Sequence, residues 1–260
     1  MCFVAALFED QPVIVDMTDQ VPVKHSLSSA PRRTDIEREN ASEKQTAQDA
    51  KQTTTMTLFS PTGQHIIAGT NKGWLNIIDT ETHQVRYSFR VTTNIIVYIR
   101  LTPSGRDVVL NSSDRIVRTL HLPDLSDPKL DFDTLQLEVE HKFQDLVQRL
   151  SWNHVSFSPT GEYVTASTWM NHHIYVWERG QGSLVKILEG TKEELSVVEV
   201  RPSDTRKLCL LTITVAPVSP LRRCRRSRLW PHLALVHLTA PALVRPRTRL
   251  SRSRGECRVH

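Results

Sequence analysis

Two neighbouring histidines, His172 and His173, follow Asn171 and are the first candidates for metal chemistry. Imidazole nitrogens are common zinc ligands, but a zinc site needs further ligands at suitable spacing. The flanking sequence supplies no third ligand, so a turn between two strands is the favoured interpretation. The four cysteines show no CxxC spacing and accompany no histidine cluster. We therefore expect no metal site, no disulfide framework and a reducing compartment.

Close pairs of carboxylates could act as a general acid and a general base. Glu193 is adjacent to Glu194, and Glu138 lies two residues before Glu140. Solvated acids at strand edges are the favoured explanation of both pairs. The sequence also lacks a GxSxG nucleophile elbow and a glycine-rich phosphate loop. We therefore expect a protein that is not an enzyme and that takes no cofactor and no small-molecule ligand.

Basic side chains offer a third kind of chemistry, the binding of phosphate groups. The candidates stand at or beside expected turns and strand ends, and they are Arg115, Arg118, Arg149 and Lys192. Basic groups that share one face bind a nucleic-acid backbone through charge, without reading its sequence. Scattered surface charge that keeps the protein soluble is the alternative for each of them. The elements that position these side chains decide between the two.

A repeated pentapeptide indicates what those elements are. FSPTG occurs at residues 59–63 and at 157–161, and the variant LTPSG occurs at 101–105. In chain order, the copies at 59 and 101 begin 42 residues apart, and those at 101 and 157 begin 56 residues apart. A unit of about 40–45 residues is typical of a four-stranded propeller blade. Residues 122–133, which contain prolines and several aspartates, explain the longer interval as an inserted loop.

Each copy is followed by the same order of short β-branched and aromatic runs with turn residues between them. After the third copy these runs are YVTAST, IYVWER and LVKILEG. Proline and glycine in SPTG suit a tight turn, because proline fixes φ and glycine accepts a positive φ. The pattern predicts antiparallel blades whose third strand ends near a Trp-Glu or Ile-Asp pair, as in WD repeats. The tryptophans expected to pack between blades are Trp74, Trp152, Trp169 and Trp177.

The predicted fold class is all-β, a partial WD-repeat β-propeller with about three complete blades and two partial ones. Residues 1–23 are expected to form a partial blade, and residues 53–200 the main blades. Residues 24–52 are almost free of apolar side chains, which predicts a solvated, partly disordered insertion. A short helix over 35–50 is the alternative. Residues 201–260 are expected to form an Arg- and Pro-rich tail of no recognised fold.

The net charge of +5 is spread unevenly along the chain. Residues 217–260 contain 11 arginines, no lysine and one acid, so the preceding part is mildly acidic. This composition is that of an out-of-frame reading of GC-rich DNA, and our hypothesis for the tail is a truncated or frameshifted product. The alternative is non-specific phosphate binding at low salt. We expect no membrane segment, because no run of about 18 apolar residues occurs. We expect no signal peptide, because the apolar N-terminus lacks a basic region and turns acidic at Glu9 and Asp10.

Several long blocks resemble one family. They are LFEDQPVIVDM (7–17), IIAGTNKGWLNIIDTET (66–82), NSSDRIVRTL (111–120) and the continuous stretch from LEVEHKF to GTKEEL (137–195). These blocks are similar to the WD-repeat subunit of the COMPASS/MLL-type histone lysine-4 methyltransferase complex. That subunit is the retinoblastoma-binding-protein-five family with its fungal homologues. The resemblance covers about residues 2–200.

This resemblance implies a nuclear, non-catalytic scaffold with a seven-bladed propeller, of which the present chain would be a version truncated at both ends. It implies four partners: a SET-domain methyltransferase subunit, an Ash-two-type subunit, a second WD-repeat subunit and the nucleosome. It also favours Arg149 among the basic candidates, because arginines on the family's propeller face approach DNA. Two alternatives are a generic WD-repeat adaptor of another nuclear complex and an inactive truncated product.

Overall fold

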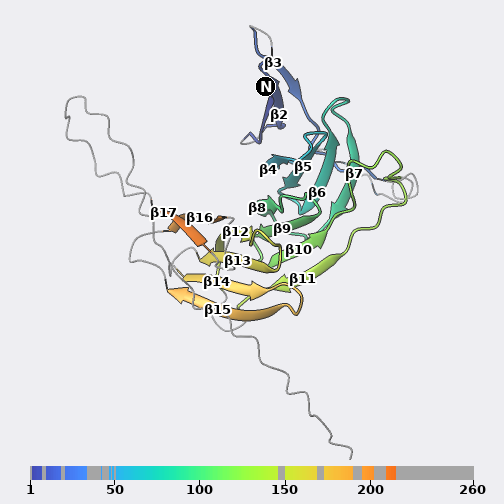
Figure 1. Cartoon of the computed structure of the whole chain (residues 1–260). Helices are drawn as coiled ribbons and strands as arrows, with labels where there is room; N and C mark the ends of the chain where they lie inside the picture. Colours follow the sequence, from blue (N-terminus) through green and yellow to red (C-terminus); the bar gives the residue numbers. More distant parts are fainter. Residues whose placement is uncertain are drawn as a thin grey trace, which may run out of the picture.

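A computed structural model of the chain describes residues 2–7, 10–18, 21–33, 51–145, 150–168, 173–189, 195–201 and 209–214, together with residues 42, 47 and 49. For residues 195–201 and 209–214 only the backbone is described. The described chain forms antiparallel sheets that are arranged as blades around a common centre (Figure 1). The prediction of a partial β-propeller is therefore confirmed.

The blades follow one another in chain order. Blade A contains β1 (Cys2–Ala5), β2 (Val13–Asp16) and β3 (Val23–Ser26). Blade B contains β4 (Thr54–Phe59), β5 (His65–Thr70), β6 (Trp74–Asp79) and β7 (Val85–Arg90). Blade C contains β8 (Ile96–Leu101), β9 (Asp107–Ser112), β10 (Val117–His121) and β11 (Val139–Phe143). Blade D contains β12 (Trp152–Phe157), β13 (Tyr163–Thr168), β14 (His173–Glu178) and β15 (Ser183–Glu189). A two-stranded sheet of β16 (Leu195–Arg201) and β17 (Cys209–Thr214) comes last.

The three pentapeptides form the same turn between the first and second strands of blades B, C and D. In each copy the glycine has a φ of 74°, and its amide donates to the carbonyl three residues earlier at 2.9 Å. A φ of this sign favours glycine, which carries no Cβ to clash with the backbone. Because the turns are equivalent, the first strands of successive blades pack side by side toward the centre of the propeller.

The blades also share their irregularities. The register shifts near the start of the first strand in blades B, C and D, and again between the third and fourth strands of each blade. The first of these shifts recurs between β16 and β17. The last sheet therefore has the pairing expected for the start of a further blade. We expected residues 201–260 to form a tail of no recognised fold, and the structure pairs Cys209–Thr214 of that stretch with β16.

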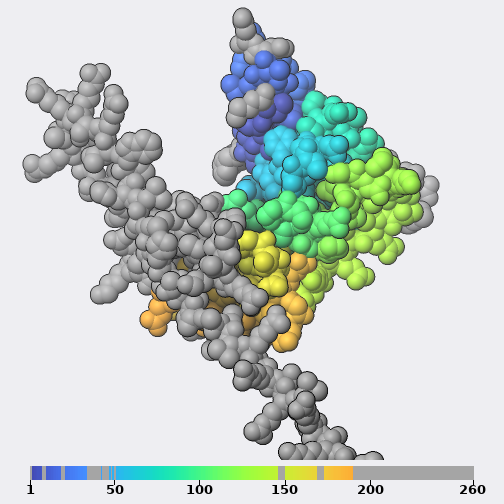
Figure 2. Space-filling model, in the orientation of Figure 1, coloured from blue at the N-terminus to red at the C-terminus, as the bar shows by residue number. Residues whose placement is uncertain are grey.

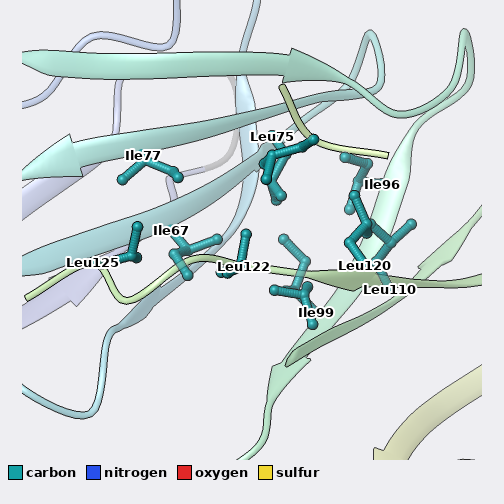
Figure 3. Packing of buried hydrophobic residues seen from close by; sticks show 11 residues of the cluster. Ile67, Leu75, Ile77, Ile96, Ile99, Leu110, Leu120, Leu122 and Leu125 are labelled. Carbon is teal, nitrogen blue, oxygen red and sulfur yellow. The ribbon is translucent and has the colours of Figure 1, made fainter. Parts of the chain in front are cut away.

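Apolar side chains fill the spaces between neighbouring blades. Figure 2 shows the blades themselves as adjoining blocks, coloured from blue through cyan and green to orange. Blades B and C meet through residues such as Ile67, Leu75 and Ile99, which are fully buried (Figure 3). The loop after β10 contributes to the same cluster, because Leu122 and Leu125 are buried within it. The predicted insertion at 122–133 is thus a loop that also closes the core between two blades.

The first residues of the predicted solvated insertion belong to the folded blades. Residues 24–26 belong to β3, and Leu27 and Ser29 are buried between blades A and B. The Ser29 carbonyl accepts a bond from Asn76 Nδ2 at 3.1 Å, and its hydroxyl lies 2.8 Å from that of Thr54. These bonds satisfy the polar groups of the segment, which is why a polar run can cross a blade interface. Most of residues 34–50, including the alternative helix, lies outside the described residues.

The tryptophan prediction is confirmed for two residues. Trp152 and Trp177 are buried between blades C and D, where their rings lie 5.2 Å apart in an edge-on arrangement. Trp74 is half-buried at the start of β6, and the guanidinium of Arg90 lies 5.8 Å from its ring centroid. Trp169 lies outside the described residues. Aromatic packing therefore contributes to the C–D interface in particular.

An ion network joins blades C and D at their outer part. Arg179, in the turn after β14, donates to Asp107 Oδ1 and to Glu140 Oε2, both at 2.7 Å. Burial raises the pKa of Asp107, but the hydrogen bonds from Arg179 and His121 outweigh it and hold that pKa below its usual value. Glu140, which the sequence suggested as a merely solvated acid, is thus one member of an interblade pair.

Replacing Arg179 by methionine is expected to lower the free energy of unfolding by about 2 kcal/mol, because two charge-assisted hydrogen bonds are lost between blades. Urea denaturation at pH 7 measures the change. The matched control is Arg106→Met, whose pair with Asp124 is more than half exposed on both sides and is expected to matter by less than about 0.5 kcal/mol. Equal losses in the two variants would contradict an interblade role for Arg179.

Candidate nucleic-acid interface

The connections between strands fall at two ends of the blades, because neighbouring strands run antiparallel. One end carries the pentapeptide turns and the turns between third and fourth strands, and we call it the pentapeptide face. The other end carries the turns between second and third strands and the links from blade to blade, and we call it the blade-link face. Arg115 lies on the blade-link face, in the turn from β9 to β10. The links that contain Arg149 and Lys192 join strand ends on the same face, but both residues lie outside the described residues.

Arg115 is the sequence candidate whose placement fits a surface contact. Its side chain is exposed, and its backbone has a φ of 68°, which is uncommon for a residue other than glycine. Its carbonyl accepts a hydrogen bond from Trp152 Nε1 at 2.9 Å. The turn that presents Arg115 is therefore anchored to the buried aromatic cluster of the next blade.

The prediction that Arg118 belongs to an exposed basic patch is wrong. Arg118 is 6% exposed, and its guanidinium donates to Ser112 Oγ at 2.6 Å and to Asp114 Oδ2 at 2.5 Å. Arg118 lies within β10, opposite Leu110 of β9. Its side chain reaches back to Asp114, in the turn that precedes β10. Its role is to hold the turn that carries Arg115.

Asp114 is the acid at the centre of this turn. Burial alone would raise its pKa, but hydrogen bonds from Arg118 and Ser112 and the charge of Arg118 hold the pKa of Asp114 at about 2. Thr92, in the link from blade B to blade C, also donates to Asp114 Oδ2 at 3.1 Å. The ionised carboxylate thus fastens the turn to the neighbouring link, while Arg118 balances its charge.

The two faces differ in how their charges are paired. On the blade-link face, Asp49 is bound by Arg33 at 2.7 Å and Asp114 by Arg118. The exposed cations of that face form no ion pair with any residue that the structure describes, and they are Lys51, Lys72, Arg90 and Arg115. Exposed acids of the same face stand on blades A and D, at Asp10 and Glu189, so the blade-link face is basic across blades B and C.

The arginines described on the pentapeptide face are engaged by acids. Arg86 pairs with Asp79 at 3.2 Å, Arg106 with Asp124 at 3.3 Å, and Arg32 with Asp133 at 2.9 Å. Further exposed acids stand at the same end, and they are Glu81, Asp127, Asp131 and Glu162. A polyanion that approaches the propeller is consequently attracted to the blade-link face and repelled by the opposite one.

Sequence reasoning missed Lys51, Lys72 and Arg90. Lys72 occupies the turn of blade B that corresponds to the Arg115 turn of blade C, so the repeat itself held the signal for it. Arg90 ends β7, opposite Trp74 in the sheet. Lys51 precedes β4, inside the stretch that we had treated as a solvated insertion.

The structure describes one residue of the histidine turn. His173 opens β14, where its amide donates to Thr168 Oγ1 at 3.1 Å, and His172 lies outside the described residues. Among the residues that the structure describes, no three His, Cys, Asp or Glu side chains gather closely enough to hold a metal ion. The same part of the chain contains no helix of the length and apolar character needed to cross a membrane.

Four-stranded blades that repeat the same turns and register shifts, with a third strand closing on Trp177-Glu178, define a WD-repeat β-propeller. No protein-family model matches the chain. The curated relative "Set1 complex component swd1" from Schizosaccharomyces pombe is 46% identical over 201 residues, which span 77% of this chain and 47% of the relative. The "Retinoblastoma-binding protein 5 homolog" from Drosophila melanogaster is 34% identical over 142 residues, spanning 53% of this chain and 28% of the relative.

A solved structure agrees with these relatives. The β-propeller domain of Cps50 (Swd1) from Myceliophteria thermophila is similar with a TM-score of 0.72 and 50% identity, covering 82% of this chain and 64% of that one. Through its propeller blades the chain belongs to the family of Swd1 and retinoblastoma-binding protein 5. It spans 47% of the length of the fission-yeast relative, about half.

Proposed function

We propose that the chain is a non-catalytic scaffold subunit of a Set1-type (COMPASS) histone lysine-4 methyltransferase complex and acts in the nucleus. The observation that carries the proposal is the 46% identity to a Set1 complex component, which runs over 77% of the chain. A propeller suits a scaffold because its rigid blades present loops to several partners at once.

The proposed partners are a SET-domain methyltransferase subunit, an Ash-two-type subunit, a second WD-repeat subunit and the nucleosome. For the nucleosome, the blade-link face is the proposed contact, with Arg115 as its described member and Arg149 and Lys192 as further candidates. The support is electrostatic, because this face presents cations without acidic partners and DNA carries a dense negative charge.

The test is purification of the tagged full chain after expression in fission yeast, followed by mass spectrometry of the proteins that accompany it. A SET-domain subunit and an Ash-two-type subunit are expected, enriched over an unrelated tagged WD-repeat protein. Recovery of another nuclear complex would contradict the proposal in favour of a generic adaptor. Recovery of chaperones alone would contradict it in favour of an inactive product.

A further inference from the structure

We propose that blade B carries a DNA-backbone contact of its own. Lys51, Lys72 and Arg90, together with Arg115 of blade C, form one line of phosphate-binding side chains across the blade-link face. We call these four residues the blade B track. The inference rests on the proposed function in taking nucleosomal DNA as the polyanion, and it adds a blade that no sequence candidate had included.

Backbone hydrogen bonds place the three segments of blade B directly beside one another. The Asn71 amide donates to the Thr53 carbonyl at 3.0 Å, so the turn with Lys72 lies against the segment that follows Lys51. The Val91 amide donates to the Gly73 carbonyl at 3.0 Å, so the same turn lies against the residue after Arg90. The three cations therefore come from adjoining segments.

The line continues into blade C through the link between the blades. Thr92 Oγ1 binds Asp114 Oδ2 at 3.1 Å, and the Ser113 amide donates to the Ile95 carbonyl at 2.9 Å. Asp114 and Ser113 belong to the turn that presents Arg115. Contacts on both sides of the link thus join the Lys72 turn to the Arg115 turn.

The loops that present the track are tightly fitted. Gly73 has a φ of 79°, and a Cβ at this position would lie 2.1 Å from the Thr92 carbonyl oxygen. Such close approach between a turn and a link leaves little freedom to either. Side chains on loops that are already ordered lose less conformational entropy when they bind.

The acids that the structure describes near the track are already neutralised. Arg33 binds Asp49 and Arg118 binds Asp114, and both arginines are mostly buried. The guanidinium groups of Arg33 and Arg90 lie 6.0 Å and 5.8 Å from the Trp74 ring centroid. Stacking of this kind positions Arg90 while its N–H groups stay free to donate to an anion. The exposed cations are thus the charges that an incoming ligand meets.

The arrangement suits the backbone of duplex DNA. The four cations of the blade B track stand at turn tips and strand ends of two neighbouring blades, so they can meet successive phosphates along a helical backbone. Each phosphate contact that a cation makes releases counterions and steepens the dependence of affinity on salt. Contacts of this type position the protein without selecting a base sequence.

The test compares two triple variants of the full chain in binding to a labelled 30-base-pair duplex of random sequence. K51A/K72A/R90A is expected to lose roughly tenfold in affinity at 0.1 M salt and to lower the salt slope by about 2 to 3. The matched control is R106A/K129A/K186A, which removes the same charge from the pentapeptide face and the rim. It is expected to bind within about twofold of the unchanged protein, since bulk charge acts weakly at a distance in salt.

Three outcomes would overturn the track. One is an equal loss in the two triple variants, which would make the effect one of net charge. A second is no loss in K51A/K72A/R90A. The third is binding of poly-glutamate as tight as that of DNA and equally sensitive to the variant, which would indicate an acidic protein partner.

Thermal unfolding measures whether both triple variants stay folded. If K51A/K72A/R90A unfolds early, the single charge reversal Lys72→Glu replaces it. The assay contains the chain and DNA alone, so its result is independent of the co-purification that tests the proposed function.

Discussion

Replacing Arg118 by alanine is expected to lower the free energy of unfolding by about 3 to 5 kcal/mol, the usual effect of breaking a buried ion pair from one side. The Asp114 carboxylate, 16% exposed, would lose the guanidinium that binds it at 2.5 Å. Ser112 would lose a hydrogen bond in the same step. Urea denaturation at pH 7 measures the change, and a loss below about 1 kcal/mol would contradict a structural role for Arg118.

The acid limb of the stability curve tests the same pair from the other partner. Since the pKa of Asp114 is lowered from 3.8 to about 2 on folding, its ionised form stabilises the native state. That contribution, about 2 kcal/mol, is fully present above the unfolded pKa and is lost as the pH falls from about 4 toward 2. In the Asp114→Asn variant, stability at pH 7 is expected to be lower and its decline between pH 4 and 2 shallower.

A double substitution separates the pair energy from the cost of an unpaired charge. Arg118→Met with Asp114→Asn removes both charges and keeps much of the side-chain volume. It is expected to be more stable than Arg118→Ala, because a pair of neutral groups leaves no buried charge without a partner. If the double variant is instead as unstable as the sum of the single ones, the two residues do not act as a pair.

The blades could be predicted from sequence because their signals are local. Within FSPTG, a hydroxyl residue, a proline and a glycine select one turn, and the turn fixes the two strands on either side of it. Gly63 and Gly161 accordingly have the same φ, although they are 98 residues apart in the chain. Strands that alternate around such turns can form few architectures, so the propeller followed from the repeat.

The state of Arg118 could not be predicted in the same way. An arginine next to a turn has the same sequence signature whether its side chain is exposed or returns to an acid four residues earlier. Whether the Arg118 side chain is exposed depends on the burial of the whole strand, in which Val117 and Leu120 are fully buried. Burial of a charge then follows from tertiary packing, which no local pattern encodes.

The boundary of blade A was missed for a related reason. Leu27 is a single apolar residue in a polar run, too little for a periodic signal, yet it is 1% exposed beside Ile14. The segment is held in place because Asn76 donates to the Ser29 carbonyl and the Ser29 amide donates to Gln11 Oε1, and these partners are far apart in sequence. Long-range polar contacts of this kind become visible only in the folded chain.

Trp152 links the core to the blade-link face, and its replacement by alanine is expected to lower the free energy of unfolding by about 3 to 5 kcal/mol. The indole is 5% exposed, and its ring lies 5.0 Å from that of Tyr175 and 5.2 Å from that of Trp177. Truncation leaves a cavity in an aromatic cluster whose members cannot easily move inward. Thermal or urea unfolding of the variant measures the loss.

Trp152→Phe separates the packing of the ring from its hydrogen bond. Phenylalanine keeps most of the aromatic contact but has no N–H to donate to the Arg115 carbonyl, so a smaller loss of about 1 kcal/mol is expected. Because that bond anchors the Arg115 turn, amide hydrogen exchange in residues 113–116 should become faster, while exchange in the Lys72 turn of blade B stays unchanged. Faster exchange in both turns would mean that the substitution loosens the whole face. Unchanged exchange in residues 113–116 would mean that Asp114 and Arg118 hold the turn without the indole.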